Sequence, residues 1–267
     1  GHGRAPFGPW RSCYRVACGC VIVPYGLLNV RFIGHATVLI ELDGVRLLTD
    51  PLLRDRVAHL RRAFPVERSM PDVDVVLVSH GHHDHLDFPS LRMLPASRVV
   101  APRKLAAGLK EFDAEGVDEG DELEIGPLTI RATHAEHEGG RPPFRTGIAL
   151  GYAILGSRRV FFAADTELFD GMTGLVEDLD LALVPIWGWG PSLGRGKHLD
   201  PETAAEAVRR LAPKVAVPIH WGTYRPFHKR ASAPFLTEPA EAFARAASEI
   251  APDVEIRVLQ PGETLEL

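Results

Sequence analysis

The chain has 267 residues, of which 45% are hydrophobic and 24% are charged, so it can bury a substantial core as one large domain or two smaller ones. Its formal net charge is −5 and it has no long run of Lys or Arg, which argues against a nucleic-acid partner. No apolar stretch approaches the roughly 18–20 residues that span a bilayer, and we therefore expect a cytoplasmic protein.

The N-terminal segment differs in character from the rest of the chain. It holds all three cysteines, Cys13, Cys18 and Cys20, at a spacing that suits neither a disulfide framework nor a usual zinc site. Regular hydrophobic patterning begins at Leu28 and continues without a linker or a repeat. We therefore expect an N-terminal appendage of residues 1–27 and one domain of residues 28–267.

From residue 28 onward, short β-rich runs alternate with helical patterns. Strands are expected, in chain order, at 28–33, 37–42, 45–50, 74–79, 121–126, 128–134, 147–155, 158–165, 181–186, 215–220, 254–259 and 263–267. Helices are expected at 88–94, 103–112, 200–212 and 237–250, the third with Asp200 as N-cap and a proline at its first position. Two β-rich blocks, each followed by helices, predict an α/β fold. It is an αββα sandwich of two packed, mainly antiparallel β-sheets flanked by helices.

The run "SHGHHDHLD" directly follows the apolar strand predicted at 74–79. His80 and His82, one residue apart on extended backbone, can point the same way and hold one ion. Asp84 and His85 lie beyond the bend and can face a second ion nearby. An internal run with aspartates at the end of a buried strand is typical of a metal site, and not of an affinity tag or a solvated turn.

Three later strand ends offer further donors, which are needed because four ligands do not close two metal sites. They are His134 or His137 in "THAEHE", Asp165 in "FFAADTE" and His220 in "VPIHWG". Asp165 follows an apolar strand, where a buried carboxylate is costly unless it meets a cation. The residues alone leave the choice between His134 and His137 open.

The order of these elements resembles the metallo-β-lactamase superfamily over nearly the whole chain from Phe32. "HGHHDH", a later His, "AADT" and "PIH" carry the resemblance. "GHATVLIELDGVRLLTDP" and "KHLDPETAAEA" are similar to the branch that contains L-ascorbate-6-phosphate lactonase and N-acyl-phosphatidylethanolamine phospholipase D. The resemblance implies the metallo-β-lactamase fold with a dinuclear centre. It assigns His80, His82 and His137 to one ion, Asp84, His85 and His220 to the other, and Asp165 to a bridging position.

This ligand set predicts a metal-dependent hydrolase. Five imidazoles and two carboxylates without a thiolate suit two divalent ions, Zn²⁺ first, with Mn²⁺ or Fe²⁺ as alternatives. Two such ions can share a hydroxide that attacks a phosphodiester or a phosphorylated lactone or ester, with Asp84 among the catalytic ligands. The resemblance also makes His198 the expected general acid. Asp50 is expected to accept a hydrogen bond from a ligand imidazole.

Two loops are the expected contacts with a small-molecule substrate. Trp187 and Trp189 can line a pocket, and Arg141 and Arg145 can pair with a phosphate. The alternative from another class is a non-catalytic, metal-stabilised ligand-binding or sensor protein. The presence of every expected ligand favours the enzyme. The sequence indicates neither a nucleic-acid partner nor a membrane span, and it leaves the oligomeric state open.

Overall fold

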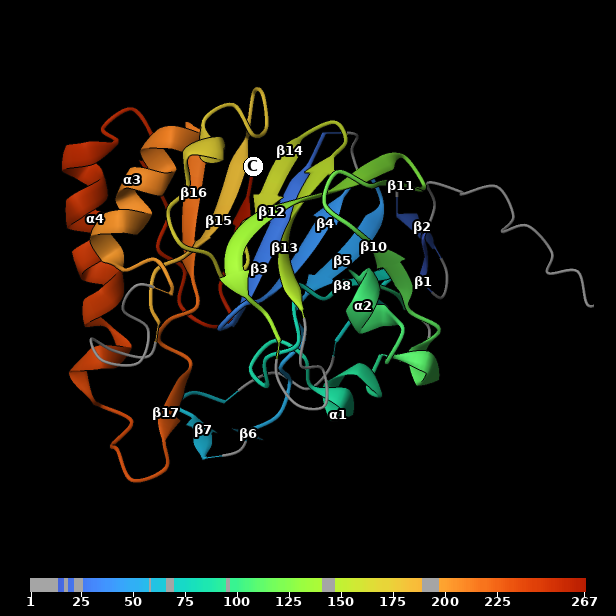
Figure 1. Ribbon diagram of the computed structural model, residues 1–267, viewed down its shortest axis with the longest axis horizontal. Coiled ribbons are helices and arrows are strands. Elements are labelled where there is room, and N and C mark those ends of the chain that lie inside the picture. Colours follow the sequence, from blue (N-terminus) through green and yellow to red (C-terminus); the bar gives the residue numbers. More distant parts are fainter. Residues whose placement is uncertain are drawn as a thin grey trace, which may run out of the picture.

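The computed structural model describes two large sheets, two small sheets and the helices that cover them. The described residues are 26–57, 59–65, 70–94, 97–140, 147–188 and 197–267, together with the backbone of 14–16 and 19–21. Among them, two seven-stranded sheets pack face to face, as Figure 1 shows. The αββα sandwich expected from the sequence is therefore confirmed.

Each large sheet contains seven strands. The first consists of β3 (Leu28–Gly34), β4 (Thr37–Leu42), β5 (Val45–Thr49), β8 (Val75–Leu77), β9 (Arg98–Pro102), β10 (Glu115–Val117) and β19 (Thr264–Glu266). The second consists of β11 (Glu122–Ile125), β12 (Leu128–Glu138), β13 (Ile148–Leu155), β14 (Arg159–Phe162), β15 (Leu181–Pro185), β16 (Val215–Ile219) and β18 (Glu255–Ile256).

The remaining elements are short sheets and helices. One small sheet pairs β1 (Tyr14–Val16) with β2 (Gly19–Val21), and the other contains β6 (Arg56–Val57), β7 (Leu60–Arg62) and β17 (Tyr224–Pro226). The helices are α1 (Phe88–Leu91), α2 (Arg103–Ala106), α3 (Pro201–Leu211) and α4 (Glu238–Ile250), with 3₁₀ turns at Lys110–Phe112, Asp170–Met172 and Pro234–Leu236. Within the described part of the chain, no helix is long and apolar enough to cross a membrane.

Both large sheets are half antiparallel and half parallel. In the first sheet, β19, β3, β4 and β5 pair antiparallel, whereas β5, β8, β9 and β10 pair parallel. In the second sheet, β11 to β14 pair antiparallel, whereas β14, β15, β16 and β18 pair parallel. The antiparallel pairs expected from the sequence thus make up only half of each sheet. A parallel partner follows a long crossover, which local patterns do not reveal.

Two hydrophobic clusters hold these layers together. The larger one fills the space between the sheets and extends to the helices of the second sheet, and it includes the fully buried Phe32, Tyr152 and Phe243. The smaller one joins the outer face of the first sheet to α1 and α2 through residues such as Leu91 and Leu105. Figure 1 shows α3 and α4 stacked beside β15 and β16. This packing fixes the strand ends that carry the polar residues of the next section.

Element boundaries differ from expectation where tertiary contacts decide them. Helix α3 starts as predicted, with the Asp200 side chain accepting from the backbone of Thr203 and Pro201 in the first turn. The helix predicted at 103–112 ends at Ala106 and resumes only as a 3₁₀ turn, since Gly108 interrupts it. Strand β12 continues past its predicted end to Glu138, with an irregularity between His134 and Glu138. It therefore contains both candidate histidines.

Candidate metal centre

Polar side chains gather at one end of the two large sheets, where several strands finish. His80 follows β8, Asp165 follows β14 and His220 directly follows β16. His137 lies near the end of β12, which runs antiparallel to β13 and therefore parallel to β14. Ligand sites in α/β proteins commonly form where the carboxyl ends of strands meet. The fold thus brings together residues that are far apart in the sequence.

One group consists of His80, His82, His137 and Asp165, whose candidate ligand atoms all lie within 4.8 Å of one another. The Nε2 atom of His80 is 2.9 Å from Nδ1 of His82, and Nε2 of His137 is 3.2 Å from the same Nδ1. These three nitrogens converge, with the carboxylate of Asp165 beside them. They are the three imidazoles that the resemblance assigns to one ion.

A second group consists of Asp84, His85, His220 and His35. The Nε2 atoms of His85 and His220 are 3.2 Å apart. They lie 3.8 Å and 3.7 Å, respectively, from Oδ2 of Asp84. The first three members are those that the resemblance assigns to the other ion. His35, from the "GHAT" turn, completes the group.

Asp165 lies between the two groups. Its Oδ2 atom is 3.1 Å from Nε2 of His85 and 3.9 Å from Nε2 of His80, and its Oδ1 atom is 3.3 Å from Nε2 of His220. Oδ1 is buried and accepts no hydrogen bond among the described residues. Such an oxygen is costly to bury unless it meets a cation. Together with imidazole donors and no thiolate, it fits a pair of divalent cations.

Asp50 links the two groups through hydrogen bonds to the Nδ1 side of their imidazoles. Its Oδ2 accepts hydrogen bonds from Nδ1 of His85 at 2.7 Å and from the Ser79 hydroxyl at 2.6 Å, and its Oδ1 accepts from the Ser79 backbone N–H at 2.7 Å. The Ser79 hydroxyl oxygen lies 2.9 Å from Nδ1 of His80. Outer contacts of this kind fix the tautomer and orientation of metal-binding imidazoles. One buried carboxylate thereby orients His85 directly and His80 through Ser79.

Backbone carbonyls orient two further imidazoles. Nδ1 of His137 donates to the carbonyl oxygen of Lys197 at 3.0 Å, and Nδ1 of His220 donates to the carbonyl oxygen of Trp187 at 2.5 Å. Both contacts leave Nε2 directed into the centre. Trp187 therefore meets the centre through its backbone, whereas the sequence suggested a role for its ring.

The electrostatics of the centre keep the imidazoles of His80 and His82 neutral and favour positive charge beside the carboxylates, at His85. Burial, aided by neighbouring histidines, holds the pKa of His80 well below its usual value and lowers the pKa of His82 to about 4. Burial would raise the pKa of Asp165, but His220 and His85 hold it well below its usual value. Burial would lower the pKa of His85, but the facing carboxylates, that of Asp165 first, raise it well above. Neutral imidazole is the form that binds metal.

Four of the eight described residues other than glycine that have positive φ angles lie around the centre. His35, Asp50, Ala164 and His220 all have positive φ angles, of 57°, 33°, 55° and 62°, respectively. Residues other than glycine rarely adopt this left-handed region, and they keep it only where surrounding contacts enforce it. Ala164 directly precedes Asp165, so all four bear directly on the groups described above. Strain of this kind is typical of functional sites.

Ser79 is a site residue that sequence reasoning missed, whereas His35, in the "GHAT" turn that the sequence suggests as structural support, holds Asp84. Nε2 of His35 lies 3.1 Å from Oδ2 of Asp84, and burial lowers the pKa of His35 to about 3, so a neutral ring donates this hydrogen bond. The backbone N–H of His35 donates to Oγ1 of Thr223 at 2.6 Å. A side chain at Gly34 would meet Thr223 at 2.6 Å, so only glycine fits there. The local sequence signals for these two residues are the "GH" turn, which holds His35, and the position of Ser79 directly before the "HGHHDH" motif.

His134 lies outside both groups. Its Nδ1 is 3.0 Å from Oε2 of Glu119 and its Nε2 is 3.2 Å from Oε2 of Glu136. Its ring also rests edge-on against Phe169. His137 therefore faces the centre and His134 does not. Of the expected substrate contacts, Arg141, Arg145 and Trp189 lie outside the described residues.

His198 stands beside the bridging position. Its Nε2 atom is 3.1 Å from Oδ2 of Asp165, and its Nδ1 is buried without a hydrogen-bond partner among the described residues. Burial would lower the pKa of His198, but the contact with Asp165 raises it above its usual value. The side chain of His198 therefore lies in contact with the carboxylate that faces both groups.

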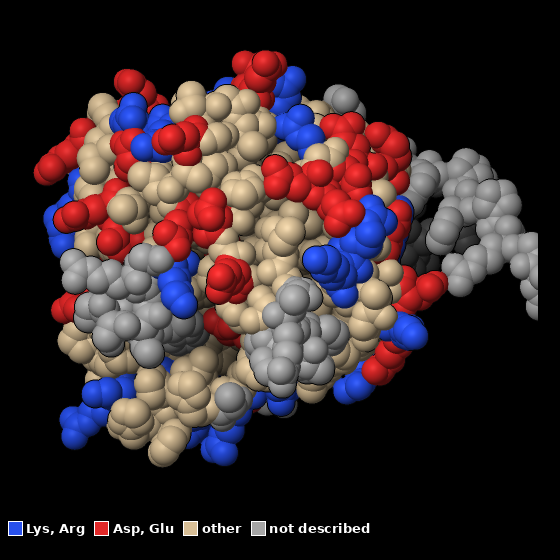
Figure 2. Space-filling model, in the orientation of Figure 1, with Lys and Arg blue, Asp and Glu red and all other residues tan. Residues whose placement is uncertain are grey.

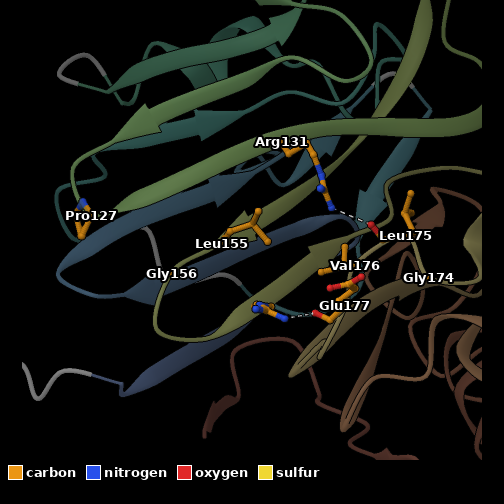
Figure 3. Close-up of a pocket in the computed structure, with 9 residues that line it drawn as sticks. Pro127, Arg131, Leu155, Gly156, Gly174, Leu175, Val176 and Glu177 are labelled. Atoms are coloured by element: carbon orange, nitrogen blue, oxygen red, sulfur yellow. Dashed lines mark hydrogen bonds between the residues drawn. The ribbon is translucent and has the colours of Figure 1, made fainter.

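A cavity of about 660 Å³ opens at the opposite end of the second sheet. Its lining includes Arg131 on β12, labelled in Figure 3, and Arg159 at the start of β14. The two guanidinium groups donate to the carbonyl oxygens of Leu175 and Glu177, at 2.8 Å and 2.7 Å, and so hold the loop that covers this end. No candidate metal group of the described residues lies there. The candidate metal-binding residues therefore lie in the imidazole cluster and not around this cavity.

An αββα sandwich that gathers buried imidazoles and carboxylates at one end of its sheets is the architecture of a metal-dependent hydrolase. Residues 45–221 match the β-lactamase superfamily domain. The chain belongs to the metallo-β-lactamase superfamily, and it is a metal-dependent hydrolase of that superfamily.

Three similar proteins illustrate this membership. A UPF0173 metal-dependent hydrolase of Methanopyrus kandleri is 31% identical over 90% of this chain and 100% of its own length. The N-acyl-phosphatidylethanolamine-hydrolyzing phospholipase D 1 of Caenorhabditis elegans is 30% identical over 74% of this chain and 64% of its own length. The structure of Igni18, a metallo hydrolase from Ignicoccus hospitalis, superposes with a TM-score of 0.69 at 24% identity, covering 90% and 98% of the two chains.

Proposed function

We propose that this protein is a dinuclear hydrolase that cleaves a phosphodiester or a phosphorylated lactone or ester. The observation that carries the proposal is the position of Asp165, whose two oxygens face both groups of imidazoles. His80, His82 and His137 would hold one ion, and Asp84, His85 and His220 the other, with Asp165 between them. Two divalent ions, Zn²⁺ first and Mn²⁺ or Fe²⁺ as alternatives, would supply a hydroxide nucleophile and polarise the oxygen under attack.

The protein's own residues prepare the centre for this chemistry. Asp50, through Ser79 and His85, keeps the Nε2 atoms of His80 and His85 turned inward. His35 holds the carboxylate of Asp84 in place with an N–H donor. Because these supports are buried, they need no rearrangement when charge develops during the reaction. His198 would give a proton to the departing oxygen.

A phosphodiester is the favoured substrate class. One relative is named as a phospholipase D that hydrolyses N-acyl-phosphatidylethanolamine, and that match spans 74% of this chain. Two ions facing each other also suit the opposite sides of a phosphoryl group in an in-line displacement. A lactone needs only polarisation of its carbonyl oxygen, so the same centre is compatible with that second class.

Metal removal tests the proposal. Initial rates on bis(p-nitrophenyl) phosphate are expected to disappear after treatment with a chelator and to return with Zn²⁺ or Mn²⁺, because the ions supply the nucleophile. Metal analysis of the restored protein should find two ions per chain. A protein with two bound ions and no turnover of phosphodiesters or of phosphorylated lactones would contradict the proposal and favour a sensor.

His198→Gln tests the proton donor separately. The rate with an alkyl leaving group, which needs a proton, should fall by about 10²–10⁴-fold, whereas a p-nitrophenolate leaving group should lose far less. Paired rate measurements on the two phosphodiesters give this ratio directly. Equal losses on both substrates would mean that His198 only orients Asp165.

A further inference from the structure

The small sheet of β6, β7 and β17 carries three arginines in a single row across its strands. Arg61 on β7 lies directly opposite Arg56 on β6 and directly opposite Arg225 on β17. Residues directly opposite each other in a sheet share one face, with Cβ atoms about 4.5–5.5 Å apart. The three side chains therefore leave the sheet on the same side.

The other face of this sheet is already occupied. Val57 and Tyr224 pack there with Leu52 in a small hydrophobic cluster, and the buried Arg62 binds the carbonyl oxygens of Ile33 and Leu52. The arginine row must therefore face away from the body of the protein. The burial of the side chains agrees with this orientation, since Arg56 and Arg61 are exposed and Arg225 is half-buried.

The row has no acidic partner among the described residues. Elsewhere on the surface, exposed arginines pair with carboxylates, as Arg92 does with Glu111 and Arg98 with Glu115. No such ion pair joins Arg56, Arg61 or Arg225 to a described acid, although like charges directly opposite in a sheet repel each other. Arg225 instead donates from Nη1 to the carbonyl oxygens of Phe227 and Lys229, so Arg56 and Arg61 are the more accessible members of the row.

The surroundings of the row add to its positive charge. Lys229 and Arg230 follow on the exposed loop after β17, and Asp55, which precedes Arg56, is the one acid among the described neighbours in sequence. Figure 2 shows Lys and Arg along the lower edge of the molecule, where Figure 1 places this sheet. The local charge is therefore strongly positive on a protein whose net charge is −5. The energetic cost of this arrangement points to an anionic ligand.

The small sheet that carries the row borders the candidate metal centre through its other face. The ring of Tyr224, on the inner face, is 6.0 Å from the ring of His35. Arg225 follows His220 so closely in the chain that their Cα atoms are at most about 17 Å apart. The inner face of this sheet therefore borders the centre, whereas the row lies on the outer face.

We infer that the row of Arg56, Arg61 and Arg225 binds a compact oligoanion at a surface site separate from the candidate metal centre. The ligand class is a compact molecule with two or more phosphate, sulfate or carboxylate groups. Guanidinium groups suit such an oligoanion because each can make paired hydrogen bonds to one of its anionic groups. A long polyanion such as a nucleic acid is disfavoured, because the rest of the surface carries net negative charge.

The test measures binding without turnover, so it stays informative if the proposed hydrolysis fails. Sucrose octasulfate serves as the probe, in calorimetric titrations of the metal-loaded protein at low and at physiological salt. We expect binding that weakens with salt and falls at least tenfold in Arg56→Glu/Arg61→Glu. The matched control is Lys104→Glu/Lys110→Glu, which changes the net charge equally at exposed positions on another face and should bind like the wild type.

Two outcomes would overturn the inference. Equal binding by the row variant and the control variant would show that only the net charge matters. Tighter binding of an oligothymidylate than of sucrose octasulfate would indicate a nucleic acid. The neutral variant Arg56→Gln/Arg61→Gln guards against misfolding, because it removes the charge and the repulsion without adding an acid, and unchanged thermal unfolding would validate its result.

Discussion

Replacing Asp165 with Asn is expected to lower metal-dependent hydrolysis by more than about 100-fold, which is the upper range for loss of a partner outside the ligand shell. The substitution preserves the shape of the side chain but removes the negative charge that both imidazole groups face. The amide nitrogen would also direct hydrogen atoms toward one of the ions. Initial rates on bis(p-nitrophenyl) phosphate, together with metal analysis, measure both consequences.

A second buried aspartate provides the control for this experiment. Asp180 accepts hydrogen bonds from Lys214 and from the backbone N–H of Arg159, at the end of the sheet opposite the centre. Asp180→Asn removes a buried charge of the same kind but should leave the metal content and the rate close to those of the wild type. If Asp165→Asn also kept two ions and full activity, the bridging position would be disproved.

Replacing Asp50 with Ala is expected to affect both stability and metal binding. The change leaves three buried donors without an acceptor, namely the N–H and hydroxyl of Ser79 and Nδ1 of His85. Each unsatisfied buried donor costs about 1–3 kcal/mol, so we expect the free energy of unfolding to fall by about 3 kcal/mol or more. Urea unfolding of the chelator-treated protein measures this loss without a contribution from bound ions.

The same substitution should weaken metal binding by about 10–100-fold, because His80 and His85 lose their orientation. Competition with a chromogenic chelator measures this affinity. Asp43→Ala provides a comparison, since Asp43 accepts hydrogen bonds from the N–H and the hydroxyl of Ser157 but lies away from the centre. It should lower stability without changing metal affinity. Unchanged metal affinity in Asp50→Ala would show that the histidines keep their orientation without the carboxylate.

Local patterns were sufficient to predict the layers of the fold and the main cluster. Apolar runs mark the strands because their side chains fill the space between the sheets, and the cap at Asp200 marks helix α3 because it satisfies the first free N–H groups of the helix. The spacing of His80, His82, Asp84 and His85 is also local, so the sequence displays it directly. These features needed no knowledge of distant partners.

Other features depend on contacts that the sequence does not display. His35 gains its role from Thr223, which is 188 residues away, and from Asp84. His134 and His137 are three residues apart, so a regular strand directs them to opposite faces and leaves open which face meets the centre. The arginine row arises only from the pairing of β6, β7 and β17, whose short and polar strands have no clear pattern. Long-range pairing thus determines what local periodicity cannot.

The ligands of each proposed ion come from both sheets, and this has a consequence for how the fold is held together. His85 follows the first sheet and His220 the second, 135 residues apart, while His82 and His137 are 55 residues apart. An ion shared by such a pair would act as a removable cross-link, closing a long loop as a disulfide does. A disulfide that closes a loop of about 100 residues restricts the unfolded chain and thereby stabilises the folded state by roughly 4–5 kcal/mol. The supply of metal would then govern the lifetime of the folded protein as well as its activity.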